Sequence, residues 1–211
     1  MTQREQAGRT WAFRAAVEVE VQGVFHALAA NSRGAPQALR ALTERAAQDE
    51  GRHRVECAEL AESLGVLVPE LPVARAGLLG PPTLSTDRRA LFTAVALGCI
   101  TESISAALLG EMLEHAQGLA RNVVHGVLRD EVDHARIGWG WLAWQAQNSD
   151  VSWLGAHVPA MIAAALPREQ VDSGVDLREF GILSGDRART IPQEVIQDVL
   201  RPGFAQFNIL F

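Results

Sequence analysis

Apolar side chains recur every three or four positions in four long stretches of the chain, a spacing that predicts four amphipathic helices. We expect Thr10 to be the N-cap of the first helix and Gly65 to follow the C-terminus of the second. The stretches cover about residues 10–30, 36–64, 85–116 and 118–147. The fold class predicted by this pattern is all-α.

The connections between these helices predict how they are arranged. The first and last connections are short turns, so each joins an antiparallel pair. The middle connection, residues 66–86, is rich in proline and glycine and cannot continue a helix. A segment of this length can cross a helix of about 20 residues, which spans about 30 Å. We therefore predict a four-helix bundle with one long crossover between its second and third helices.

The last third of the chain has a weaker pattern. We assign residues 1–149 to the bundle and residues 150–211 to a C-terminal extension. Within the extension we expect a short helix near 157–166, and a second one that opens at 190–194 and is ended by Pro202 and Gly203. Its last residues are strongly apolar, so we expect them to pack on the bundle or on a partner subunit.

Two copies of the motif Asp-Glu-x-x-His are the main chemical signal. Asp49, Glu50 and His53 lie on the second predicted helix, and Asp130, Glu131 and His134 lie on the fourth. A glutamate and a histidine three positions apart project from one helical face, so each pair can offer a carboxylate oxygen and an imidazole nitrogen to one metal ion. Both glutamates have mostly small or apolar neighbours at helical spacing. Coordination to a metal would offset the unfavourable burial of their charge.

A bundle with such a site should supply one further glutamate from each remaining helix. Glu102 is the candidate on the third helix, since Val95, Cys99 and Ala106 flank it at helical spacing. The first helix has two candidates, Glu18 and Glu20. The helical wheel mildly favours Glu20, whose face is the more apolar.

This set of residues resembles the carboxylate-bridged di-iron site of the ferritin-like superfamily, which includes bacterioferritins, rubrerythrins and di-iron oxygenases. It is most similar to bacterial ferritin-like proteins that carry Asp-Glu-x-x-His on the second and fourth helices. In that set a tryptophan precedes the ligand glutamate of the first helix by seven residues and a phenylalanine follows it by seven, as Trp11 and Phe25 do around Glu18. The resemblance covers about residues 10–148 and favours Glu18 over Glu20.

The resemblance implies a ferritin-like bundle that holds two metal ions, iron or alternatively manganese, about 3.5–4 Å apart. The implied ligands are Glu18, Glu50, His53, Glu102, Glu131 and His134. It also implies that Asp49 and Asp130 accept hydrogen bonds from the free N–H groups of the metal-bound histidines, each across the gap between two helices.

Composition narrows the chemistry further. All 19 basic residues are arginines and the chain has no tyrosine, which excludes a Schiff-base lysine, a P-loop lysine and a tyrosyl radical. The net charge of −6 argues against nucleic acid or an anionic membrane as partner. We expect no transmembrane helix, no signal peptide and a cytoplasmic location. The two cysteines, Cys57 and Cys99, form no disulfide framework, and we expect them to be small buried residues.

These observations lead to one main functional hypothesis and two alternatives. The first is a di-metal oxidase or oxygenase that activates O₂ to oxidise a small organic substrate. It would take electrons from a donor that the sequence does not identify, and a homodimer is one assembly we consider. The second is iron handling, as a ferroxidase, an iron-storage protein or a peroxide scavenger. The third is a metal-free interaction module, which the complete ligand set disfavours.

Overall fold

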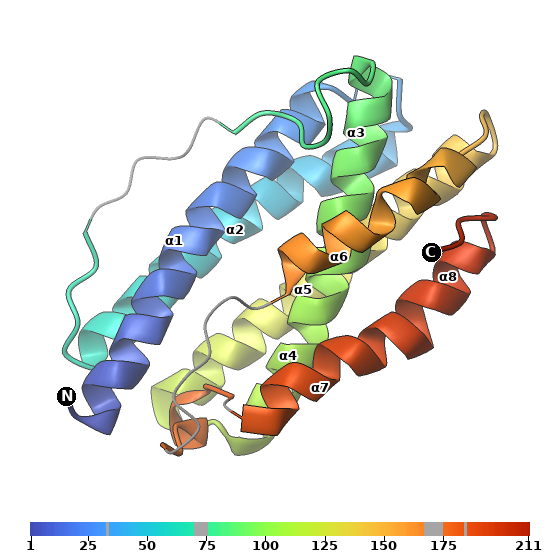
Figure 1. Cartoon of the computed structure of the whole chain (residues 1–211). Helices are drawn as coiled ribbons and strands as arrows, with labels where there is room; N and C mark the ends of the chain where they lie inside the picture. The colour runs from blue at the N-terminus through green and yellow to red at the C-terminus, as the bar shows by residue number, and fades with distance from the viewer. Residues whose placement is uncertain (33, 70–75, 167–174, 184) are drawn as a thin grey trace.

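The computed structural model describes residues 1–32, 34–69, 76–166, 175–183 and 185–211, and these residues form helices and no strands. Four long helical segments run side by side (Figure 1). The first is α1 (Gln3–Ala30), the second is α2 (Gln37–Ser63), the third is built from three consecutive elements and the fourth is α5 (Gly118–Ala146). The all-α four-helix bundle expected from the sequence is thus confirmed.

The first helix starts earlier than the sequence predicts. It begins at Gln3 rather than near Thr10, because Thr2 and Glu5 form a capping box. The Thr2 hydroxyl accepts a hydrogen bond from the backbone N–H of Glu5, and the Glu5 carboxylate accepts one from the backbone N–H of Thr2. The boundaries expected for α2 and α5 agree with the structure to within one residue at each end.

The third helical segment is interrupted by a wider turn. It consists of α3 (Thr86–Ala94), the π-helical segment η1 (Val95–Thr101) and α4 (Glu102–His115). Ser85 caps its N-terminus, where the sequence predicts that the helix begins. The Thr101 hydroxyl donates to the carbonyl of Ala96, five residues earlier. The periodicity gave no sign of the π-helical turn, which lies directly before Glu102.

The described parts of the crossover between α2 and α3 lie at the two ends of the bundle, residues 65–69 beside the end of α2 and residues 76–85 beside the start of α3 (Figure 1). The crossover starts at Gly65, which has a φ of +90° and ends α2 in the backbone region that favours glycine. Residues 70–75 of the crossover lie outside the described residues. Helix α1 packs on α2, and α4 packs on α5, so the two short connections join neighbouring helices.

The C-terminal residues form a further helical layer over α4 and η1. It contains η2 (Ser152–Ala156), α6 (Val158–Ala165), η3 (Arg178–Phe180), α7 (Gly185–Val195), η4 (Ile196–Leu200) and α8 (Arg201–Ala205). Residues 167–174 and 184 lie outside the description. Figure 1 shows α7 and α8 as one long, continuous helical segment beside the bundle.

Two predictions for this layer are wrong. The final helical segment begins at Gly185 rather than at 190, and it passes through Pro192 and Pro202 to end at Ala205. Pro202 follows the π-helical segment η4 and stands in the first turn of α8, where a missing N–H is tolerated. Pro192 lies inside α7, and its burial together with Ile191 and Val195 offsets the lost hydrogen bond.

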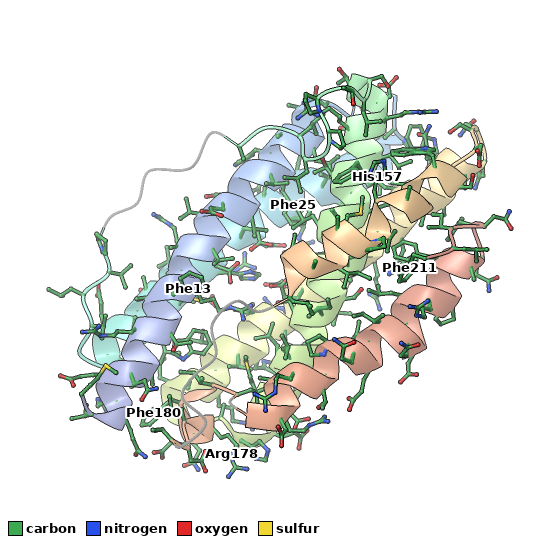
Figure 2. All side chains as sticks on the ribbon, viewed as in Figure 1. Phe13, Phe25, His157, Arg178, Phe180 and Phe211 are labelled. Carbon is green, nitrogen blue, oxygen red and sulfur yellow. The ribbon has the colours of Figure 1, made fainter. Side chains whose placement is uncertain are left out.

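The apolar C-terminus is only partly covered. Phe204 and Ile209 are fully buried, and the Phe204 ring contacts those of Trp139 and Phe211 (Phe211 is labelled in Figure 2). Leu210, by contrast, is 76% exposed. The chain end therefore packs on the bundle through alternate residues rather than as a whole.

The segment Thr86–His115 is long and apolar enough to cross a membrane by length and composition, contrary to the expectation that no such stretch exists. The fold buries 61% of its most apolar window. Core helices of soluble bundles pass the same test, so this feature is weak evidence for a membrane span.

Candidate metal centre

All four helical segments of the bundle contribute to one buried cluster of acidic and imidazole side chains. Helix α1 contributes Glu18 and α4 contributes Glu102, while α2 and α5 each contribute a glutamate and a histidine. Each of these six residues is at most 3% exposed. The structure therefore brings together the six residues that the sequence selected: Glu18, Glu50, His53, Glu102, Glu131 and His134.

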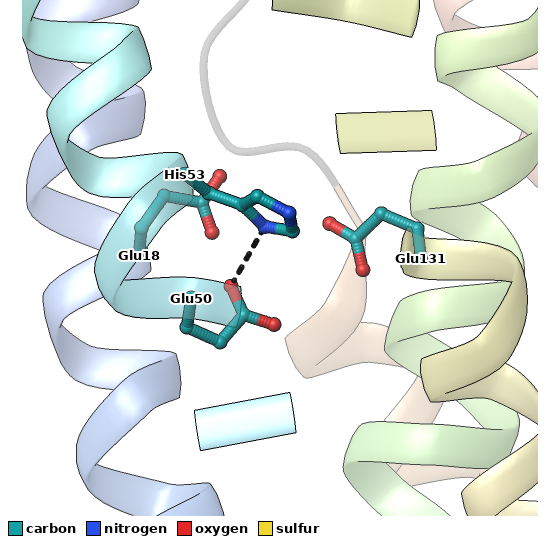
Figure 3. A group of neighbouring side chains, drawn as sticks. All are labelled: Glu18, Glu50, His53 and Glu131. Carbon is teal, nitrogen blue, oxygen red and sulfur yellow. Dashed lines mark hydrogen bonds and ion pairs between the residues drawn. The ribbon is translucent and has the colours of Figure 1, made fainter. Parts of the chain in front are cut away.

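The six residues form two overlapping groups, in each of which the potential ligand atoms lie within 4.8 Å of one another. One group is Glu18, Glu50, His53 and Glu131, whose side chains point toward one another in Figure 3. The other is Glu50, Glu102, Glu131 and His134. Glu50 and Glu131 belong to both groups, so each could contribute to the binding of both metal ions if two were bound.

The two imidazoles present the same nitrogen to the cluster. Nδ1 of His53 lies 3.3 Å from Oε2 of Glu50 (dashed in Figure 3). Nδ1 of His134 lies 2.9 Å from Oε1 of Glu50 and 3.3 Å from Oε2 of Glu131. The Nε2 atoms consequently point away from the cluster, where a proton on them can be held by other groups.

The aspartates of the two motifs meet these outer nitrogens crosswise. Nε2 of His53, on α2, lies 3.2 Å from Oδ2 of Asp130 on α5. Nε2 of His134, on α5, lies 3.5 Å from Oδ2 of Asp49 on α2 and makes no hydrogen bond within the described residues. Each aspartate thus lies beside the histidine of the other motif, and Asp130 makes the kind of hydrogen bond that orients metal-bound imidazoles in proteins.

Arg52 links the two aspartates. Its Nη1 donates to Oδ1 of Asp49 at 2.9 Å, and its Nη2 donates to Oδ2 of Asp130 at 2.5 Å. Arg129 donates to both oxygens of Asp130. Burial alone would raise the pKa of Asp130, but hydrogen bonds from Arg129, Arg52 and His53 hold it well below its usual range. Asp130 therefore remains an anion beside His53.

Each charged group in the cluster changes the pKa values of its neighbours. Burial raises the pKa values of Glu18 and Glu102 well above the usual range. Arg14 acts to lower the pKa of Glu18, while the neighbouring glutamates act to raise the pKa values of both. Burial also acts to raise the pKa of Glu50, but His134 and His53 outweigh it and lower that pKa to about 2. In the other direction, burial lowers the pKa values of the two histidines, while contacts with the glutamates raise them to about 9 for His53 and about 10 for His134.

Several potential metal-ligand atoms in the cluster have no hydrogen-bond partner, although they are buried. Oε1 of Glu50, Oε1 of Glu102, Oε2 of Glu131 and Nδ1 of His134 are buried and make no hydrogen bond within the described residues. Nδ1 of His134 and Oε1 of Glu50 are close in space, yet they are not oriented as donor and acceptor. Buried polar atoms without partners are unfavourable, and coordination to a cation would satisfy them.

A close contact between two glycines sets the spacing of the helices around the cluster. A Cβ on Gly98 would lie 2.6 Å from Cα of Gly138, and one on Gly138 would lie 2.3 Å from the backbone nitrogen of Cys99. The segment η1 and helix α5 can therefore approach until their backbones touch. This approach occurs one turn before Glu102 and one turn after His134, so it brings the two ligand-bearing stretches together.

The structure separates the two candidates on α1. Glu18 is buried in the cluster and Glu20 is exposed. The helical wheel favoured Glu20 because Phe13 and Val17 lie on its face, but these two residues are 49% and 36% exposed. Arg14, a polar residue one turn before Glu18 on the same helical face, is a partner of the cluster.

Sequence reasoning missed the arginines and a serine around the cluster. Arg14, one turn before Glu18, donates to its carboxylate at 3.0 Å and to the hydroxyl of Ser105 at 3.2 Å. The sequence signal for these contacts was helical spacing. Arg14 lies four residues before Glu18, and Arg52 lies three residues after Asp49, so each pair shares a helical face. Both cysteines are buried in apolar clusters, as expected, and neither belongs to the two ligand groups found within the described residues.

No protein-family model matches the chain, and no curated protein matches it. Among solved structures, the fold is similar to that of a Synechococcus protein with aldehyde deformylating oxidase activity. The TM-score is 0.62 at 19% sequence identity, and the alignment covers 98% of this chain and 91% of that one. The likeness therefore extends over the C-terminal helices as well as the bundle, and at this identity it concerns the fold alone.

Proposed function

We propose that the protein is a di-metal oxidase or oxygenase that uses two iron ions, or manganese in their place, to activate O₂ and oxidise a small organic substrate. The observation that carries the proposal is the pair of buried ligand groups that share Glu50 and Glu131. The fold likeness to a protein with aldehyde deformylating oxidase activity supports it.

The residues have distinct roles in this proposal. Glu18 and His53 would hold one ion, Glu102 and His134 the other, and the two shared glutamates would lie between them. Iron or manganese bound there would supply the redox chemistry with O₂. The chain itself contains no lysine or tyrosine that could act as a nucleophile, acid or base.

The protein's own contribution would be geometry, charge and exclusion of water. Asp49 and Asp130 would hold the Nε2 protons of the histidines, which keeps Nδ1 free to bind a cation. The four ionised glutamates would balance the charge of two divalent ions. The burial of all six ligands would keep bulk water away from the reacting centre.

The test is metal content followed by reactivity. Protein from iron-replete cells should contain two metal ions per chain, and its reduced form should consume O₂. Glu131→Ala and His134→Ala should abolish this consumption while the helical content stays unchanged. A folded His134→Ala protein that holds no metal but consumes O₂ as fast as the parent would contradict the proposal.

Iron handling remains the second candidate, because the same ligand set would also bind iron as a substrate. Native mass separates the two candidates. A large closed shell would favour storage, whereas a monomer or dimer that turns over an organic substrate with an external electron donor would favour the oxidase.

A further inference from the structure

The two ligand groups are alike in composition but differ in their surroundings. Each has one glutamate and one histidine of its own and shares Glu50 and Glu131 with the other. We refer to the group with Glu18 and His53 as subsite 1 and to the group with Glu102 and His134 as subsite 2. Any difference in their affinity for a cation must come from groups outside this matched set.

A positive charge lies against subsite 1. Nε of Arg14 is 3.0 Å from Oε1 of Glu18, and its Nη2 is 3.6 Å from Oε1 of Glu131. The hydroxyl of Ser105 accepts from Nη2 of Arg14 and donates to Oε1 of Glu131 at 3.4 Å, which holds the guanidinium in place. The Arg14 side chain is 21% exposed and that of Glu18 is 4% exposed, so water screens this pair much less than a surface pair.

Subsite 2 has no such neighbour in the contacts that the described residues make with Glu102. Oε1 of Glu102 has no hydrogen-bond partner there, and the charged groups that act on it most are Glu131, Glu50 and Glu18. Among the described residues, Glu102 of subsite 2 therefore has negatively charged neighbours, whereas Glu18 of subsite 1 pairs with a cation that belongs to the protein. The other carboxylate near Arg14, that of Glu131, is common to both subsites.

We propose that Arg14 is a positioning residue that makes the two subsites unequal, so that subsite 2 binds the first metal ion tightly and subsite 1 binds the second more weakly. The guanidinium competes with a metal ion for the Glu18 carboxylate, and it also repels a divalent cation placed beside it. This inference rests on the proposed di-metal function, and it adds an order of loading that ligand identity alone does not give.

The order of loading can be measured by titrating metal-free protein with Co²⁺ under anaerobic conditions, following heat release and the visible absorption of the bound ion. The parent should bind two ions in two resolved steps. Arg14→Gln should lower the Kd of the second step about tenfold or more, because a unit charge a few ångströms from a divalent ion interacts strongly at an effective dielectric constant near 20. Arg14→Lys, which keeps the charge, should resemble the parent.

Arg136→Gln is the matched control, since Arg136 also pairs with a carboxylate on a ligand-bearing helix, Asp133, but has a side chain that is 75% exposed. It should leave the two steps as they are in the parent. A second step that is unchanged or weaker in Arg14→Gln would overturn the proposal. An Arg14→Lys protein that binds like Arg14→Gln would also overturn it, because the charge would then not be the cause.

Two ligand variants test the order without changing Arg14. Glu18→Ala should remove the weaker step and keep the tighter one, and Glu102→Ala should remove the tighter step. The reverse assignment would refute the proposed order. Two steps of equal affinity in the parent would refute the inference but leave the di-metal function standing, whereas a parent that binds fewer than two ions would refute the function itself.

Discussion

Replacement of Asp130 by alanine tests whether the outer carboxylates act on metal binding. Asp130 lies 3.2 Å from Nε2 of His53 and does not reach into the ligand groups themselves. Its removal leaves all six ligands in place but takes away the anion that fixes the His53 ring and the proton on its outer nitrogen. The change should therefore weaken one subsite without abolishing it.

The expected size follows from the nature of the contact. Loss of an outer partner of a metal-bound histidine typically weakens metal affinity by about 10–100-fold. This range corresponds to about 1.4–2.7 kcal/mol of binding free energy. Asp49→Ala should weaken metal binding less, because Nε2 of His134 lies 3.5 Å from Asp49 without a hydrogen bond.

The assay is a metal titration of each variant beside a control on the same helix. Asp133 lies one turn further along α5, pairs with Arg136 and has a side chain that is 65% exposed. Asp133→Ala should bind metal as tightly as the parent. If Asp130→Ala also bound metal as tightly as the parent, the crosswise contacts would have no role in holding the histidines.

Three further outcomes follow from the structure. Gly138→Ala should lower the melting temperature and weaken metal binding together, because its Cβ would overlap the facing backbone; overpacking of this kind typically costs about 1–3 kcal/mol. Phe204→Ala should destabilise the protein by about 3–5 kcal/mol in chemical denaturation, whereas Leu210→Ala, at a 76% exposed position, should change little. The metal-free protein should melt at progressively lower temperature as the pH rises from about 6.5 to 9–10, since His53 and His134 have raised pKa values in the folded state and lose their stabilising protons over that range. A melting temperature that rises across that window would contradict the charge assignment.

The ligand cluster was the most predictable part of the molecule. Two Asp-Glu-x-x-His motifs on separate helices can converge only if those helices pack together, and short-range spacing fixes which side chains share a face. Glu102 was found in the same way. Glu18 could be chosen over Glu20 only from the resemblance to ferritin-like proteins. The helical wheel assumes that an apolar face is buried, but the face of Glu20 is exposed at Phe13 and Val17.

Other features depend on tertiary contacts that spacing does not encode. The π-helical turn before Glu102 arises where η1 meets α5 at Gly98 and Gly138, which lie 40 positions apart. The helix through Pro192 persists because packing outweighs the local preference of proline. Arg14 belongs to the site because its long side chain reaches Glu131 on another helix, which no pattern within α1 predicts.

Anomalous scattering at the absorption edge of iron or manganese, from crystals of the metal-loaded protein, tests the central claim most directly. The account predicts two peaks about 3.5–4 Å apart inside the bundle, one beside Glu18 and His53 and the other beside Glu102 and His134, with Glu50 and Glu131 between them. No peak within the bundle, or a single peak away from these six side chains, would contradict it.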